Sequence, residues 1–292
     1  LSRQNTFSLS PTWFEAMDKK KYYNMSMPFR QILDFGYRSG IISYNPFAHA
    51  QINKKLLVKK RKPEAKTQVY TEAEEFFLMR LAWEEWKEDN SLGACLALIL
   101  LFYTGLRIGE VVALKRSDID GLVAHICRSE VEVSVQIDET TFKQIGHMVI
   151  DHPKTSAGFR DVYLTHGGRE VVDAALSGVA ARGADDSYLF TNGITRVNVD
   201  MVTYRLKKYC NILGIPFRSA HKIRKTYVSH LIDGGVNIDA ARIQVGHEDE
   251  RTTLRCYTFN TKTQDETNEQ FERALSTLAP NPGILVTANG YR

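Results

Sequence analysis

The stretch "LGACLALILLFYTG" at residues 92–105 constrains the fold of this chain more than any other. Its apolar residues follow no single face, so a helix over residues 92–103 would be apolar all round. Such a helix is stable only where other elements cover it on every side. The run is shorter than the roughly 18 apolar residues that indicate a membrane span, so it predicts the central helix of a globular core.

The surrounding sequence predicts further helices and a small sheet. In "TEAE", Thr71 and Glu74 form a capping box, which starts a helix that runs to about residue 88. Stretches 124–137 and 142–150 alternate with period two and are rich in Val and Ile, so they predict antiparallel strands, and "RDVYLT" predicts a third. The fold class is therefore α+β and mainly helical, with other helices predicted over residues 12–43, 167–182, 198–213, 219–233, 238–245, 251–258 and 263–279.

Positive charge is concentrated at the N-terminal end of the chain. Residues 1–66 carry 13 Lys/Arg and four Asp/Glu, which leaves +9, whereas the remainder carries 25 and 30, which leaves −5. A basic segment beside a near-neutral body favours a polyanionic partner such as nucleic acid, although a solvated lysine-rich face has the same composition. The run at residues 54–66, which contains Pro63, predicts a linker between a small helical domain and a larger one.

Length and composition fit a two-domain globular protein. Of the 292 residues, 43% are hydrophobic and 25% are charged, which is ordinary for such proteins. Four cysteines lie far apart without metal-ligand spacing, which favours a reduced, cytosolic setting: Cys95, Cys127, Cys210 and Cys256. We find no secretory signal in the sequence. Its first residue is Leu1 rather than Met, which predicts that an N-terminal portion is missing.

Two short segments place single cations beside turns. In "YTGLRIGEVVAL", Arg107 follows the buried helix, where a charge is costly unless it is paired or used. An ordinary ion pair with Glu110, in the first turn of the next helix, would satisfy it. In "DHPKTSAGFRDVYL", Lys154 lies in a turn between two strands, where most lysines are simply solvated. Neither segment alone indicates a function.

Two further segments combine histidines with other polar residues. In "AHKIRKTYVSHL", His221, Arg224 and Lys225 share one helix face, so they present positive or donor groups to one anion. In "VGHEDERTTLRCYTF", His247 follows a helix that ends at Gly246, and Tyr257 comes ten residues after His247. Each segment is again weak by itself.

Taken together, the four segments resemble the tyrosine recombinases of the phage-integrase family. That family carries an arginine in a "TGLR" box, a lysine in a β-turn, "HxxR", "GH" and then a nucleophilic tyrosine. Over about residues 67–260 the same order and spacing fall on Arg107, Lys154, His221, Arg224, His247 and Tyr257. The resemblance selects Arg224 over Lys225 and Tyr257 over Tyr227, which it leaves as a core aromatic. The "PKTSAGFR" turn and the TT-x-x-x-Y ending look most like integrases of conjugative transposons and temperate phages.

The resemblance implies a site-specific DNA recombinase that integrates or excises a mobile element through a covalent 3′-phosphotyrosine. Arginines suit this chemistry because they bind non-bridging phosphate oxygens bidentately and stay charged. Tyr257 would attack phosphorus, Lys154 would protonate the leaving 5′-oxygen, and His221 and His247 would donate hydrogen bonds, with His221 also able to take the tyrosine proton. We expect no cofactor and no metal, since no GxxxxGK[ST] motif and no carboxylate cluster stands out.

The family also implies an architecture and partners. Residues 1–53 would form a truncated core DNA-binding domain and residues 67–260 the catalytic domain, which together close on double-stranded DNA as a C-shaped clamp. The linker would cross the DNA backbone with Lys54, Lys55, Lys59, Lys60, Arg61 and Lys62. Residues 261–292 would form a tail that a neighbouring protomer receives, so that a monomer assembles on DNA into a dimer to tetramer. An excision or DNA-bending factor is a further expected partner; a membrane is not.

Three other functions stay open at this point. A type IB topoisomerase-like or telomere-resolving strand transferase would use the same chemistry, but the histidine at each usual recombinase position favours a recombinase. A non-catalytic DNA-binding protein with a vestigial site would bind DNA without forming a covalent adduct. A helical interaction scaffold would lack the salt-dependent DNA binding that basic residues confer.

Overall fold

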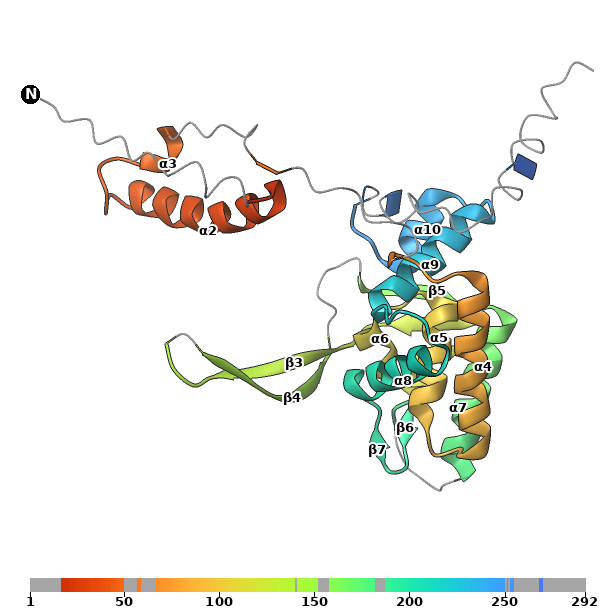
Figure 1. The fold of residues 1–292 in the computed structure, drawn as a ribbon. Coiled ribbons are helices and arrows are strands. Elements are labelled where there is room, and N and C mark those ends of the chain that lie inside the picture. Colours follow the sequence, from red (N-terminus) through yellow and green to blue (C-terminus); the bar gives the residue numbers. More distant parts are fainter. Residues whose placement is uncertain are drawn as a thin grey trace, which may run out of the picture. The chain divides into compact units, whose positions relative to one another are not determined.

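The computed structural model describes residues 17–49, 57–58, 67–139, 141–151, 158–181, 187–249, 251, 253–254 and 268–269. The chain divides into two compact units, Leu1–Pro63 and Glu64–Arg292, which are described separately (Figure 1). This boundary lies within the predicted linker 54–66. Within the described ranges, every helix is too short or too polar to cross a bilayer.

The first unit is built on helix α2 (Lys19–Arg38), followed by the short α3 (Pro46–His49). Asp18 caps α2, since its side chain accepts a hydrogen bond from the Lys21 amide at 2.9 Å. The helix ends at Arg38, five residues before the predicted end at residue 43. The N-terminal part of the predicted helix 12–43 lies outside the described residues, as does most of the predicted linker.

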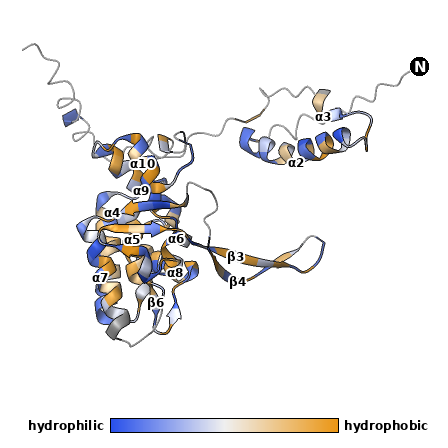
Figure 2. Cartoon of the chain, turned by 180° about the vertical axis from the view of Figure 1, so that it is seen from behind, coloured by the Kyte–Doolittle hydropathy of each residue, from blue (hydrophilic) through white to orange (hydrophobic). Residues whose placement is uncertain are grey.

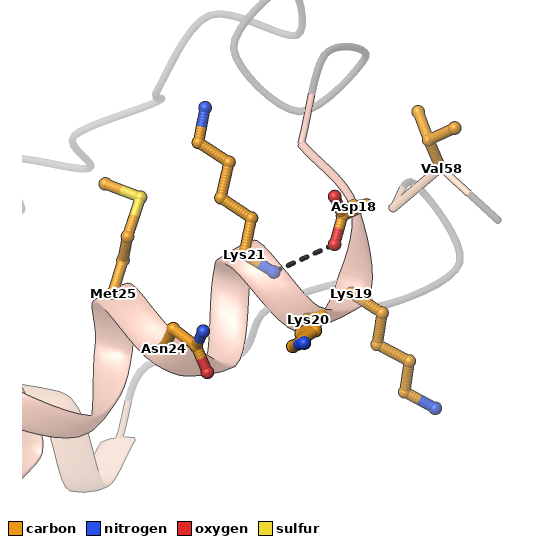
Figure 3. A pocket seen from close by; sticks show the side chains of 7 residues that line it. All are labelled: Asp18, Lys19, Lys20, Lys21, Asn24, Met25 and Val58. Carbon is orange, nitrogen blue, oxygen red and sulfur yellow. Dashed lines mark hydrogen bonds between the residues drawn. The ribbon is translucent and has the colours of Figure 1, made fainter. Parts of the chain in front are cut away.

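A pocket in this unit is strongly basic. Its lining contains three consecutive lysines (Figure 3): it consists of Asp18, Lys19, Lys20, Lys21, Asn24, Met25 and Val58. The lysines occupy the first turn of α2, which contains no acidic residue and where the helix dipole adds further positive charge. Three lysines against the single carboxylate of Asp18 leave the lining with a net positive charge.

The second unit is wrapped around α5 (Gly93–Thr104), as the apolar run predicts. Every residue of α5 except Tyr103 is buried. The helix packs against α4 (Glu72–Glu88), α7 (His166–Ala181), α8 (Val199–Ile212) and α9 (Ala220–Asp233), and the hydrophobic interior is seen in Figure 2. The predicted capping box is present: the Thr71 side chain accepts from the Glu74 amide, and the Glu74 carboxylate accepts from the Thr71 amide.

Two antiparallel sheets follow in the chain. Strands β1 (Ile119–Asp120), β2 (Val123–Ile126) and β5 (Arg160–Tyr163) form one, in the order β1-β2-β5. Strands β3 (Ser129–Gln136) and β4 (Phe142–Ile150) form a separate hairpin that projects from the body of the unit (Figure 1). The predicted strand 124–137 is therefore wrong in its continuity: β2 pairs with β5 and β3 pairs with β4, and Cys127 and Arg128 lie between the two strands.

The remaining elements are short, apart from α10. Helix α6 (Ile108–Val112), the 3-10 helix η3 (Arg116–Asp118) and α10 (Ile238–Val245) join longer elements, and β6 (Thr191–Asn192) pairs with β7 (Thr195–Arg196). Helices α7 to α10 agree with the predicted ranges to within about one residue at each end. The hairpin β6–β7 was not predicted, since two-residue strands carry no periodic signal. Most of the predicted helices 251–258 and 263–279 lies outside the described residues.

Gly105 ends α5 in a left-handed conformation with φ of +59°. A Cβ at this position would lie 2.3 Å from Cδ1 of Tyr227, so the aromatic ring occupies the space that a side chain would need. Glycine is therefore required twice, for the backbone conformation and for the contact with α9.

Gly105→Ala tests this double requirement against a matched control. Gly121 also has a positive φ, +55°, but no atom lies within 4 Å of the position of its missing Cβ. We expect Gly121→Ala to lower the free energy of unfolding by about 1–2 kcal/mol through backbone strain alone. Gly105→Ala should lower it by about 1–3 kcal/mol more, because the Tyr227 ring must move. Urea titration measures both, and equal losses would contradict the packing role of Gly105.

Candidate active site

The structure brings four of the six predicted site residues to the ends of α5 and α10. Arg107 is the N-cap of α6, His221 and Arg224 belong to the first turns of α9, and His247 follows α10. Helix C-termini present carbonyl groups without intrahelical partners and carry partial negative charge. The C-terminal ends of α5 and α10 therefore stabilise cations.

Arg224 is bound at both helix ends. Its side chain is buried, Nη1 donates to the carbonyl of Gly105 at 3.0 Å, and Nη2 donates to the carbonyl of Val245. Its Nε donates to Nε2 of His247 at 3.3 Å. These three bonds hold the guanidinium between the end of α5 and the end of α10.

Arg107 is also bound by a carbonyl at the end of α10, but its side chain stays accessible to solvent. Its Nη2 donates to the carbonyl of Gly246 at 3.0 Å, and its Nη1 donates to Oε1 of Glu110 at 2.8 Å. The ion pair with Glu110 that the sequence offers as an ordinary explanation is thus present. It does not exclude a ligand, since the Arg107 side chain is 41% exposed.

Glu110 is the buried carboxylate that binds Arg107 and Arg160. Its side chain is 1% exposed, and it accepts from the Arg107 amide at 2.9 Å and from Arg160 at 2.8 and 3.1 Å. Burial alone would raise the pKa of this carboxyl, but the hydrogen bonds and charge of Arg160, and then the charge of Arg107, hold the pKa below its ordinary value. Arg160 was missed at the sequence level, where its only signal was a cation inside a predicted strand.

His247 is a neutral connector. Its Nε2 accepts from Arg224 and its Nδ1 lies 3.0 Å from Oγ1 of Thr253, so this pattern assigns the ring proton to Nδ1. Burial, followed by the charges of Arg224 and Arg107, lowers the pKa of His247 to about 3. The ring thus joins Arg224 to Thr253, four residues before Tyr257.

The neighbouring residues of α9 have different surroundings. His221 is exposed at the surface, but the surrounding protein still removes water from its ring. This desolvation, followed by the charges of Lys225 and Arg224, lowers the pKa of the ring. Lys225 donates to Oε1 of Gln68 at 3.1 Å. Tyr227 is half-buried and accepts from Gln244 at 3.2 Å, and burial raises the pKa of its hydroxyl, which fits its interpretation as a packed aromatic.

Two predicted site residues lie outside the described residues. Lys154 falls in the segment between β4 and β5, and Tyr257 comes three residues after Leu254, so their roles stay predictions. The same holds for the six predicted DNA-binding residues of the linker, Lys54, Lys55, Lys59, Lys60, Arg61 and Lys62. Among the described residues, no three His, Cys, Asp or Glu side chains gather as a metal site would require.

A helical domain that wraps one buried helix and carries small antiparallel sheets has the fold of tyrosine recombinase catalytic domains. Residues 78–264 match the phage integrase family, which is more than half of the chain. The chain belongs to this family. The predicted family and fold class are confirmed.

Relatives are similar over part of their length. A tyrosine recombinase XerC-like protein of Caldanaerobacter subterraneus subsp. tengcongensis is 28% identical over 180 residues, which cover 55% of this chain and 44% of that protein. The ICEBs1 integrase of Bacillus subtilis is 26% identical over 163 residues, which cover 53% of this chain and 42% of that protein. The chain therefore spans less than half the length of these relatives.

Solved structures share the fold. The Tn1549 transposon integrase, solved in complex with transposon right end DNA, matches with a TM-score of 0.60 and 23% identity over 88% of this chain and 80% of that chain. The XerA recombinase matches with a TM-score of 0.51 and 17% identity over 87% of this chain and 83% of that chain. At such identities the likeness concerns the fold.

The lowered pKa of His247 predicts acid sensitivity. The folded ring titrates at about 3 and an unfolded histidine near 6.5, so between these pH values only the unfolded chain takes up a proton here. The stability that neutral His247 contributes is full above about pH 6.5 and falls with the pH, by up to about 1.4 kcal/mol per unit. We expect His247→Gln to reduce the slope of unfolding free energy between pH 7 and 4.5, measured with urea.

His125→Gln is the control for this experiment. His125 is exposed, and its hydrogen bond to Asp161 raises the pKa of its ring, so its titration acts with the opposite sign. Removing it should not reduce the acid sensitivity. An unchanged slope in His247→Gln would contradict the neutral assignment.

Proposed function

We propose that this protein is a site-specific DNA recombinase that integrates or excises a mobile element. The observation that carries the proposal is the pair of arginines anchored at the ends of α5 and α10, with Arg107 41% exposed beside the neutral His221 and His247. Such a pair is suited to the two non-bridging oxygens of a phosphodiester. Two relatives support a mobile-element substrate by their names, the ICEBs1 integrase and the Tn1549 transposon integrase.

The proposed chemistry balances without a cofactor. Oη of Tyr257 forms a bond to phosphorus while the bond from phosphorus to the 5′-oxygen breaks. His221 takes the phenol proton, which its lowered pKa permits at neutral pH, and Lys154 gives a proton to the leaving oxygen. Arg107 and Arg224 stabilise the charge that develops on the phosphorane. The reverse reaction with another 5′-hydroxyl rejoins the strand.

His247 makes contacts beyond the role that the motif implies. In the described geometry it accepts from Arg224 and pairs with Thr253, so it orients an arginine and the segment that leads to Tyr257. We infer that it acts by positioning before any direct donation to the phosphate. Direct donation by His247 stays a prediction.

DNA would be held through the basic N-terminal residues. The pocket at the start of α2 presents Lys19, Lys20 and Lys21 (Figure 3), and the linker adds the six cations named above. Each phosphate contact that a cation makes contributes about 0.9 to the salt slope of binding, so titration at several salt concentrations measures their use. Cys95, Cys127 and Cys210 are free thiols, as expected in a reducing compartment such as the cytoplasm, where we propose that the protein acts on DNA.

Tyr257→Phe tests the proposed reaction. A duplex with a nick near the cleavage site traps the covalent intermediate. The sequence of this duplex is obtained first, by selecting the DNA that the protein binds from a random pool. We expect Tyr257→Phe to bind this duplex like the parent protein and to form no covalent adduct on a denaturing gel. Tyr227→Phe is the control and should keep the adduct. An adduct that survives in Tyr257→Phe would contradict the assignment.

The C-terminal tail is proposed to act between protomers. Phe271, Ala274, Leu275 and Leu278 repeat at helical spacing in a segment outside the described residues. A chain that ends at Lys262 should bind a single site normally but lose cooperative assembly on paired sites, as measured by the size of the complexes on a native gel. Cooperative assembly without the tail would leave it as a helix that packs on its own domain.

A further inference from the structure

We propose that Lys222 and Lys225 form a second phosphate-binding position, which takes a phosphate next to the reacting one in the same DNA strand, an inference that rests on the proposed recombinase reaction. Both lysines are half-buried and belong to α9, the helix that also carries His221 and Arg224. Residues three apart on a helix are neighbours, so the two side chains extend from the same face of α9.

The two lysine ammonium groups share one oxygen atom. Nζ of Lys222 donates to Oε1 of Gln68 at 2.5 Å, and Nζ of Lys225 donates to the same atom at 3.1 Å. Nε2 of Gln68 donates to the carbonyl and the hydroxyl of Thr67 at 3.2 and 3.1 Å, so the amide is oriented with its oxygen toward the lysines. Because an amide has no net charge, these bonds gather two positive charges around one atom without neutralising either charge.

Buried contacts fix Gln68 beside α9. The amide of Tyr70 donates to Oγ1 of Thr226 at 2.8 Å, and the Thr226 hydroxyl donates to the carbonyl of Lys222 at 3.0 Å. The Tyr70 hydroxyl donates to the carbonyl of Arg218, just before α9, at 2.5 Å. Tyr70 and Thr226 are both fully buried. The segment before α4 and the first turns of α9 are therefore joined, which makes the lysine pair a preformed feature of the domain.

Stability alone gives no reason for two cations at this place. Like charges at so short a separation repel each other. Lys222 also lies in the first turn of α9, which contains no acidic residue and where the helix dipole disfavours a positive charge. One donor would be enough to bind the Gln68 oxygen. A phosphate would offset both charges at once, since its oxygens accept several charge-assisted hydrogen bonds.

The lysine pair lies in the electrostatic surroundings of the arginine pair. After desolvation, the charges that lower the pKa of His221 are, in order, those of Lys225, Arg224, Lys222 and Arg107. The lysines and the arginines therefore act on the same ring. Each strand of DNA carries a phosphate about every 3.4 Å along the helix axis. A strand that places one phosphate on the arginines thus brings its neighbouring phosphates close to them as well.

Gln68→Glu tests the proposal because it replaces the shared amide oxygen by a carboxylate of the same shape. The carboxylate should pair with both lysines, which raises the urea concentration at the midpoint of unfolding, and should compete with a phosphate for them. We expect the full chain to bind the selected nicked duplex about tenfold more weakly than the parent protein at physiological salt. A variant that is more stable but binds this duplex as the parent does would reduce the lysines to a structural contact and overturn the proposal.

A double variant, Lys222→Gln with Lys225→Gln, measures the number of phosphates. If both lysines bind one phosphate, the slope of log affinity against log salt concentration should fall by about 0.9. Lys87→Gln is the matched control, since Lys87 is an exposed cation in the last turn of α4, where it lies over the Trp83 ring. It changes the net charge as Gln68→Glu does, and it should keep the slope and bind within about twofold of the parent, because distant exposed charges are screened.

The outcomes separate this site from the proposed reaction. If the parent protein forms a covalent adduct but the double variant keeps the parent slope, or loses no more affinity than Lys87→Gln, only the lysine site is wrong. If the parent protein binds the duplex and forms no adduct, the proposed reaction fails, and the change of slope still decides whether the lysines bind a phosphate. A parent protein that binds no duplex would overturn both.

Discussion

The buried carboxylate of Glu110 between Arg107 and Arg160 is the interaction on which the site depends. A lone carboxylate at this depth would be strongly disfavoured, and either arginine without it would lose its orientation. The carboxylate receives hydrogen bonds from both guanidiniums and from the Arg107 amide, so the start of α6 and the start of β5 are locked to one group. Because Arg107 remains partly exposed, the lock leaves one face of a cation available to an anion.

The ends of two helices complete this arrangement. Gly105 and Gly246 both adopt left-handed conformations that end α5 and α10. Chain reversal at these glycines exposes carbonyls that bind Arg224 and Arg107. The apolar α5 thus contributes to the site without a functional side chain of its own, since its burial fixes where the carbonyl of Gly105 lies. The core and the site share the same structural elements, and a strained replacement at Gly105 would disturb both.

Most of the fold follows from the sequence, because long elements carry strong periodic signals. The apolar run, the Thr71–Glu74 capping box and helices α7 to α10 appear where they were predicted. The interruption between β2 and β3 could not be predicted, since it depends on their pairing with two different strands, β5 and β4. Arg107, Arg224 and His247 were predicted from motifs, but Arg160 was not, because its role arises from contacts with Glu110 and Gln244, distant in sequence.

The protonation state of His247 follows from the arginines beside it. The arginines carry a charge that no physiological pH removes, and this charge, added to burial, keeps His247 neutral. A neutral ring can accept from Arg224 at Nε2 and donate to Thr253 at Nδ1, which a protonated ring could not do. His247 therefore works as a link only while it lacks the second proton. The same charges therefore maintain the hydrogen-bonded path from Arg224 through His247 to Thr253, so the arginine cluster and the segment that follows α10 depend on one electrostatic arrangement.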